Sequence, residues 1–326
     1  MAKPKVYATH SLFAAARQIL EESCDVEYWT DPERPPREEV LRRVKDKEGL
    51  VCLLTEKINE EFLHAAPKLR IAANVAVGFD NIDVAACTKR GVAATNTPGV
   101  LDETTADFAW TLLMAVARRL AEGEALARSG NWKNWNLDQL VGTDVWGKTL
   151  GIVGFGRIGR SVARRAGGFQ MRIIYTDALR AAPEVEKELK VEFREMNALL
   201  AEADFISVHV PLLPETRGLF DSSKFQRMKR TAFLINTSRG PVVNEAALVA
   251  ALESGTIAGA ALDVYENEPL IHPGLKRTNV VLAPHMASAS LETRTKMACM
   301  AAGNVVALFK GQRPANILNP EVLKSS

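Results

Sequence analysis

The 326-residue sequence lacks the features that mark several large classes of protein. Its four cysteines, Cys24, Cys52, Cys87 and Cys299, have neither metal-site nor redox spacing, so we expect buried free thiols and no metal. Basic and acidic residues nearly balance, with a formal net charge of +2. Since no basic block alternates with aromatic residues, the sequence predicts no nucleic-acid partner.

Long apolar runs are also missing. No run approaches the roughly 20 residues that a membrane-spanning helix needs. Residues 1–7 lead into a predicted strand without an apolar leader. We therefore predict no membrane partner and a cytoplasmic protein. Hydrophobic residues nevertheless make up 47% of the sequence, which suffices for two domains with sizeable cores.

The first third of the chain alternates short β-rich runs with helical patterns. Strands are predicted over residues 5–9, 26–29, 49–55, 69–75 and 92–95. Helices are predicted over residues 12–22, with Ser11 as N-cap, about 36–45, 59–65 and 81–90, the last ending at Gly91. Repeated βα units predict a parallel sheet covered on both faces.

The strongest local signal is the run TLGIVGFGRIGRSVA at residues 149–163, which predicts a strand, a glycine turn and a helix start. Gly154 allows the turn, Gly156 lets the backbone approach a pyrophosphate, and Gly159 lets the helix pack closely. Asp177 follows a second apolar run, at the distance where a dinucleotide fold binds the ribose 2′-OH. We predict a preference for NAD over NADP, which Arg180 could soften.

Later strand-like runs also carry polar residues at their carboxyl ends, where open parallel sheets bind ligands. These runs cover residues 204–211, 232–240, 259–264 and 280–285. His285 could transfer a proton, Glu268 could hold its imidazole, and Arg239 offers donors for a carboxylate or carbonyl. From residue types alone, Arg239 could equally pair with an acid and Glu268 could be a solvated loop residue.

Two other stretches leave alternatives open. Residues 75–83 place a glycine loop after a strand, where backbone N–H groups could hold a carboxylate, or Asp80 or Asn81 could simply cap a helix. A helix over residues 106–120 is apolar around most of its circumference, so it lies inside its domain or against a second subunit. A C-terminal helix over about residues 291–310 is long enough to return to the first half.

Taken together, these stretches make the sequence resemble the D-isomer-specific 2-hydroxyacid dehydrogenases over essentially its full length. The matching stretches are residues 74–83, 151–159, 209–211, 236–240, 259–269 and 284–285. Within that family the chain is most similar to the glyoxylate/hydroxypyruvate reductase branch. This likeness rests on residues 53–55, 141–148 and 283–290.

The resemblance implies an α/β fold of two doubly wound parallel-sheet domains. A Rossmann-type NAD-binding domain over residues 99–287 would be inserted into a flavodoxin-like substrate domain over residues 1–98 and 288–326. It implies NAD(P)H-dependent reduction of a small 2-oxo acid, glyoxylate or hydroxypyruvate. Arg239 would anchor the acid, His285 would be the acid/base, and Glu268 would orient His285. It also implies a homodimer through the long helix after Gly99, in which Trp132 or Trp135 reaches a partner pocket.

The same resemblance gives a wider set of contacts. The implied substrate contacts are Leu53, Ala76, Val77, Gly78, Arg239 and His285. The implied cofactor contacts are Thr105, Gly154, Phe155, Gly156, Arg157, Ile158, Gly159, Asp177, Val210, Pro211, Thr216, Thr237, Ser238, Asp263 and Ala287.

Two other functions are alternatives at this point. One is a sister enzyme acting on phosphoglycerate or D-lactate, although the roughly forty residues after His285 leave no room for the regulatory domain that many phosphoglycerate dehydrogenases add. The other is a cofactor-sensing scaffold similar to the C-terminal-binding-protein corepressors, which share the fold and the three polar residues. The sequence contains no evident recruitment motif, which disfavours the scaffold.

Overall fold

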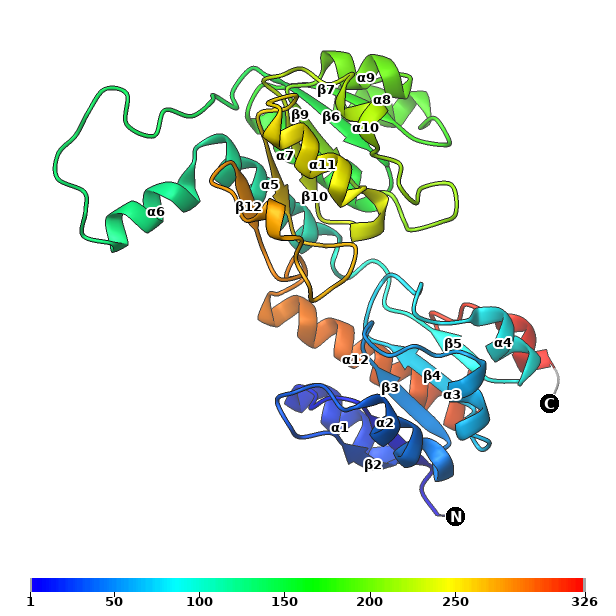
Figure 1. Cartoon of the computed structure of the whole chain (residues 1–326). Helices are drawn as coiled ribbons and strands as arrows, with labels where there is room; N and C mark the ends of the chain where they lie inside the picture. Colours follow the sequence, from blue (N-terminus) through cyan, green and yellow to red (C-terminus); the bar gives the residue numbers. More distant parts are fainter. Residues whose placement is uncertain (1, 325–326) are drawn as a thin grey trace. The chain divides into compact units, whose positions relative to one another are not determined.

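A computed structural model describes residues 2–324 of the chain, which divides into two compact units (Figure 1). The first unit is Met1–Leu101 together with Ala289–Ser326, and the second is Asp102–Ser288. Among the described residues, no helix combines the length and apolar character needed to cross a membrane.

The first unit is built on a five-stranded sheet in which every pairing is parallel. Its strands are β1 (Lys5–Ala8), β2 (Asp25–Tyr28), β3 (Gly49–Cys52), β4 (Ile71–Asn74) and β5 (Ala93–Thr95). The spatial order β2-β1-β3-β4-β5 is that of flavodoxin-like sheets. Strands β3, β4 and β5 are buried along their whole length, as expected for parallel strands with helices on both faces.

Five α-helices cover this sheet. They are α1 (Ala14–Ser23), α2 (Arg37–Arg43), α3 (Glu60–Ala65), α4 (Val84–Lys89) and α12 (Leu291–Phe309), with short 3-10 turns η1 (Val44–Asp46) and η4 (Pro320–Lys324). Helix α12 packs against α1, β3 and β4, with Ala298, Ala301, Ala302 and Val305 in the shared core. The C-terminal helix is therefore part of the first unit.

The predicted N-cap of α1 is wrong, and neither residue named in the alternative interpretation of residues 75–83, Asp80 or Asn81, caps α4. Helix α1 begins at Ala14 after an extended Phe13, and no side chain caps it, so Ser11 is not its N-cap. Helix α4 is capped by Asp83, whose carboxylate accepts the Ala86 N–H at 2.9 Å. Asn81 does not cap it, because its side-chain oxygen accepts a hydrogen bond from Asn74 Nδ2 at 3.1 Å instead.

The second unit contains a seven-stranded parallel sheet. Its strands are β6 (Thr149–Val153), β7 (Arg172–Thr176), β8 (Val191–Phe193), β9 (Phe205–Val208), β10 (Phe233–Asn236), β11 (Gly259–Leu262) and β12 (Val280–Leu282). The spatial order is β12-β11-β10-β9-β6-β7-β8, so the strands after β6 are added first on one side of it, as β7 and β8, and then on the other, from β9 to β12. Doubly wound sheets bind ligands at this switch point, between β6 and β9. The short edge strand β8 was not predicted. The predicted fold class of two parallel-sheet α/β domains is confirmed.

The second unit contains helices on both faces of its sheet. Its helices are α5 (Asp102–Ala117), α6 (Leu120–Arg128), α7 (Arg157–Gly168), α8 (Pro183–Leu189), α9 (Met196–Glu202), α10 (Ser222–Phe225) and α11 (Glu245–Glu253), with η2 (Gly240–Val242) and η3 (Pro273–Leu275). Helix α6 has no buried residue. Helix α5 packs on α7, β10, β11 and β12, and eight of its 16 residues are buried. It ends before the predicted Leu120, because Arg119 adopts a left-handed backbone at φ 51°.

Candidate active site

The three glycines after β6 differ in what surrounds them. Gly154 has φ +93°, and a side-chain carbon there would lie 2.7 Å from the His209 carbonyl carbon. A side-chain carbon at Gly159 would lie 2.2 Å from the Gly154 oxygen. A side-chain carbon at Gly156, in contrast, would have no neighbouring atom within 4 Å. Packing therefore requires the first and third glycines, whereas the second leaves open space beside the backbone.

This open space lies at the N-terminus of α7, and its surroundings fit a dinucleotide. Gly156 is the N-cap, so no side chain occupies the free N–H groups of the first turn. Asp177 comes next to the turn, where its carboxylate accepts the Phe155 N–H. At the end of β10, the buried Thr237 hydroxyl has no hydrogen-bond partner among the described residues. N–H groups that can donate to a pyrophosphate and a carboxylate that can accept from a ribose hydroxyl are the groups that a dinucleotide site uses.

The remaining expected cofactor contacts in this unit lie at strand ends or near helix starts. Val210 and Pro211 follow β9, and the Thr216 hydroxyl donates to the Pro211 carbonyl at 2.6 Å. Ser238 follows β10, where its hydroxyl donates to Asn236 Oδ1 at 2.8 Å. Thr105 is buried in the first turn of α5. Two further expected contacts are in the first turn of α7, with Arg157 exposed and Ile158 half-buried.

His209 follows β9 and contacts the glycine turn. Burial lowers the pKa of His209 to about 3, and its Nε2 lies 2.8 Å from the Ser207 hydroxyl. The imidazole is therefore neutral at physiological pH. A neutral, hydrogen-bonded ring suits a wall of the crevice better than a proton donor.

The structure brings Arg239, Glu268 and His285 to one edge of the sheet. They follow β10, β11 and β12, which are neighbours in the sheet. His285 Nδ1 lies 2.8 Å from Glu268 Oε2. Burial alone would raise the pKa of Glu268, but the His285 hydrogen bond and the charges of His285 and Arg239 outweigh it and lower the pKa. Glu268 is thus an ionised partner for the imidazole.

Tyr265 holds this arrangement together, although the sequence analysis did not single it out. Its N–H donates to the second oxygen of Glu268 at 3.0 Å, and its hydroxyl donates to the Ala283 carbonyl at 2.9 Å. A side-chain carbon at Gly240 would lie 1.9 Å from the Tyr265 carbonyl. The segment that carries Arg239 therefore packs directly on the backbone before Glu268, which is why a glycine follows the arginine.

Asp263 fixes the backbone that carries His285. Its fully buried carboxylate accepts the N–H groups of Met286 and Ala287 at 2.7 and 2.8 Å, and its carbonyl accepts the His285 N–H at 2.9 Å. Burial raises the pKa of Asp263, and the two N–H donors only partly oppose that rise. His285 has φ 52°, a left-handed conformation that costs free energy in a residue other than glycine. The three hydrogen bonds stabilise it.

In the first unit, the loop after β4 is held by its carbonyl groups. The carbonyls of Ala76, Val77 and Gly78 accept hydrogen bonds of 2.9, 2.7 and 2.9 Å. The donors are the Thr97 N–H, Asn96 Nδ2 and Asn74 Nδ2, in that order.

This anchoring sets the direction of the N–H groups in the same loop. A trans peptide points its N–H opposite to its carbonyl, so the N–H groups of Val77, Gly78 and Phe79 are directed away from these donors. They have no hydrogen-bond partner within residues 2–324. Successive free N–H groups form an anion-binding concavity. Leu53, the other expected contact in this unit, directly follows β3 and is half-buried.

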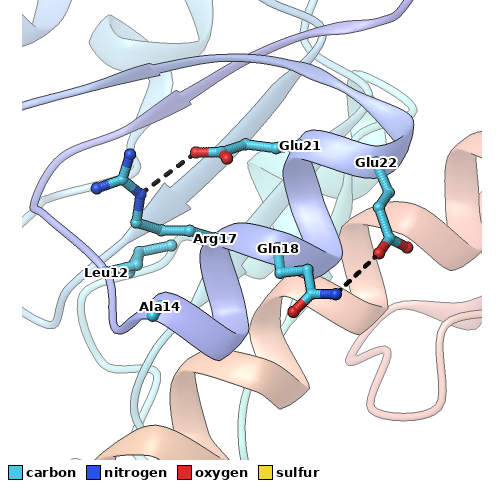
Figure 2. A pocket seen from close by; sticks show the side chains of 6 residues that line it. All are labelled: Leu12, Ala14, Arg17, Gln18, Glu21 and Glu22. Carbon is cyan, nitrogen blue, oxygen red and sulfur yellow. Dashed lines mark hydrogen bonds and ion pairs between the residues drawn. The ribbon is translucent and has the colours of Figure 1, made fainter.

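A separate surface hollow of about 520 Å³ lies along α1 (Figure 2). Its polar groups pair along the helix, Arg17 with Glu21 and Gln18 with Glu22, both at 3.3 Å. These pairs are typical of a solvated helix face. We do not consider this hollow a candidate site. Within the described residues, no cluster of three His, Cys, Asp or Glu side chains could hold a metal ion.

Comparison with known proteins agrees with this geometry. Residues 110–287 match the model of the D-isomer specific 2-hydroxyacid dehydrogenase NAD binding domain. A glyoxylate reductase from Korarchaeum cryptofilum is 53% identical over 99% of this chain and 98% of its own length. Another from Thermococcus kodakarensis is 49% identical, with the same coverage of 99% and 98%.

A solved structure extends the likeness to three dimensions. An NADPH-dependent glyoxylate/hydroxypyruvate reductase from Sinorhizobium meliloti, in complex with NADP and malonate, superimposes with a TM-score of 0.86. It is 32% identical, and the match covers 98% of each chain. The comparisons of sequence and fold show that this chain belongs to the D-isomer-specific 2-hydroxyacid dehydrogenase family and is an NAD(P)-dependent oxidoreductase.

Proposed function

We propose that this chain reduces glyoxylate or hydroxypyruvate to the corresponding D-2-hydroxy acid with a reduced nicotinamide cofactor. The observation that carries the proposal is the 2.8 Å contact between His285 and Glu268, beside Arg239 and on the same sheet edge as the glycine turn. The glyoxylate reductase names of the two archaeal relatives support this choice of substrate over phosphoglycerate or D-lactate.

In this proposal, His285 supplies the proton of the reaction. The reduced nicotinamide supplies a hydride to C2 of the 2-oxo acid when it is bound. His285 Nδ1 faces Glu268, which leaves Nε2 as the ring nitrogen that can donate to the carbonyl oxygen. Ionised Glu268 stabilises the imidazolium before transfer and orients the ring.

Each unit offers donors that suit a 2-oxo acid. Arg239 offers a planar set of N–H donors for the carboxylate and the carbonyl oxygen, which polarises that carbonyl. The free N–H groups of the loop after β4 suit the substrate carboxylate, with Ala76, Val77 and Gly78 forming the loop and Leu53 on the adjacent strand end. The dinucleotide would occupy the glycine turn, Asp177 and the strand-end residues described above.

NADH is the cofactor we propose, because Asp177 stands beside the glycine turn. A carboxylate at this position accepts the ribose 2′-OH and repels a 2′-phosphate. The S. meliloti relative is NADPH-dependent, so the family contains both preferences.

We also propose that the chain forms a homodimer through α6 and the segment after it. Helix α6 has no buried residue, and Figure 1 shows α6 and the following segment projecting from the seven-stranded sheet of its unit. Large apolar side chains are exposed there, namely Leu120, Trp132, Trp135, Leu137, Val141 and Trp146. Exposed apolar side chains in such number mark an interaction surface. Sedimentation should give a dimer that Leu137→Glu weakens, whereas a monomeric wild type would contradict this.

The reaction is tested by adding 2-oxo acids to the purified chain with NADH and following the loss of reduced-cofactor absorbance. We expect glyoxylate and hydroxypyruvate to give the highest kcat/KM, and NADH to be used better than NADPH. Turnover confined to a phosphorylated or bulkier 2-oxo acid would favour a sister enzyme. No turnover with any 2-oxo acid would favour a cofactor-sensing scaffold.

A further inference from the structure

The turn after β7 carries an acid and a base whose side chains face opposite neighbours in the sheet. Asp177 faces the β6 side, where its carboxylate accepts the Phe155 N–H. Arg180 faces the β8 side, where its guanidinium carbon lies 5.6 Å from the ring centroid of Phe193. Since β7 lies between β6 and β8, Arg180 is directed away from the glycine turn.

Glu186 in α8 holds Arg180 in this position. Arg180 Nε and Nη2 donate to the two oxygens of Glu186 at 2.8 and 2.9 Å. The buried Tyr175 hydroxyl donates to the same carboxylate at 2.7 Å and accepts the Ala181 N–H at 2.9 Å. A bidentate pair fixes the geometry of a guanidinium more strictly than a single hydrogen bond. The pair is anchored to the core of the unit through Tyr175.

We propose that Glu186 and Phe193 are cofactor-specificity residues, which hold Arg180 away from the adenosine ribose so that Asp177 alone sets the charge there. NADP differs from NAD by a phosphate on the ribose 2′-oxygen, and proteins that accept it offer a basic side chain. Arg180 is the one basic residue among the four that follow β7. The inference rests on the proposed cofactor site.

The experiment measures binding of NAD⁺ and NADP⁺ to the full chain by calorimetry. Arg180→Ala should change the ratio of the two dissociation constants by less than about twofold, because Arg180 already faces away. Glu186→Gln keeps an acceptor for Tyr175 but removes the charge that holds Arg180. It should tighten NADP⁺ relative to NAD⁺ about tenfold, the size of a new charge-assisted contact. The double variant should lose this gain.

Glu184→Gln is the matched control. Glu184 lies in the first turn of the same helix, is exposed and makes no ion pair with another described residue. Its substitution removes the same charge without releasing Arg180, so the ratio should stay at the wild-type value. Equal gains in Glu184→Gln and Glu186→Gln would overturn the proposal, because net charge alone would then explain them.

Two further results would also overturn it. One is a large loss of NADP⁺ affinity in Arg180→Ala alone, since Arg180 would then already contact the 2′-phosphate. The other is an unchanged ratio in Glu186→Gln at unchanged thermal stability. Arg180 is largely exposed, so the alanine variant tests the proposal even if Glu186→Gln fails to fold. A chain that binds NAD⁺ but reduces no 2-oxo acid would contradict the proposed reaction and leave this test intact.

Discussion

The strand ends of β10 to β12 and the loop after β4 are built in opposite ways. In the second unit, backbone groups and one buried acid hold the side chains that would act on substrate. The Tyr265 N–H holds Glu268, and Asp263 holds the turn that carries His285. In the first unit, the side chains of Asn74 and Asn96 hold a backbone whose N–H groups face outward.

The difference follows from what each region has to supply. Proton transfer needs a group that titrates near neutral pH, which only a side chain provides. Binding of a carboxylate needs several converging donors, which consecutive N–H groups provide without the desolvation of a charge. We therefore expect substitutions in the two regions to change different kinetic constants.

The largest expected effect is that of His285→Ala. Loss of a general acid should lower kcat for glyoxylate by about 10²–10⁴-fold. Affinity for NADH should stay at the wild-type value, which calorimetry checks. His272→Ala is the control, because His272 accepts the Gly274 N–H in a 3-10 turn and should leave kcat unchanged. Turnover near wild type in His285→Ala would remove the histidine from the mechanism.

A smaller effect is expected for Glu268→Gln, which keeps the shape but removes the charge beside the imidazole. Without this charge the imidazolium loses a stabilising partner, so the pH profile of reduction should differ from that of the wild type. At pH 7.5 kcat should fall about tenfold. In the wild type, the lowered pKa of Glu268 keeps its carboxylate ionised at pH 5. The stabilisation that this charge gives is lost only when the pH falls below the usual range of carboxyl pKa values.

The control for this substitution is Glu266→Gln. Glu266 is on the same loop, but its carboxylate accepts the Glu245 N–H instead of facing the imidazole. Its pH profile should match the wild type. A profile in Glu268→Gln that also matches the wild type would show that the carboxylate does not act through His285.

The smallest effect is expected for Asn96→Ala, which frees the Val77 carbonyl. The loop N–H groups lose one constraint, so KM for glyoxylate should rise about five- to tenfold while kcat changes little. Asn319→Ala is the matched control, since Asn319 is also buried and bonds Ala94 and Val92 in the same unit. It should lower thermal stability without changing KM. A fall in kcat with unchanged KM in Asn96→Ala would break the contrast between the two regions.

Sequence patterns predicted much of the fold because they are local. Alternating β-rich and helical runs identified eleven of the strands that the structure contains, and the short edge strand β8 was missed because three residues carry little periodicity.

Helix caps were less predictable than strands. Asn81 has the right residue type for a helix cap, but its side-chain oxygen accepts from Asn74 Nδ2 and its side-chain N–H donates to the Glu56 carbonyl, which is distant in sequence.

By itself, the sequence determined the glycine turn, the two sheets and the polar residues at the strand ends, because spacing along the chain encodes each of them. Only the tertiary structure decided which strand ends are neighbours, that Tyr265 and Asp263 position Glu268 and His285, and that Arg180 faces β8 instead of the glycine turn. The physical reason is that these contacts join residues from different strands and helices, and their directions depend on how the sheet orders its strands.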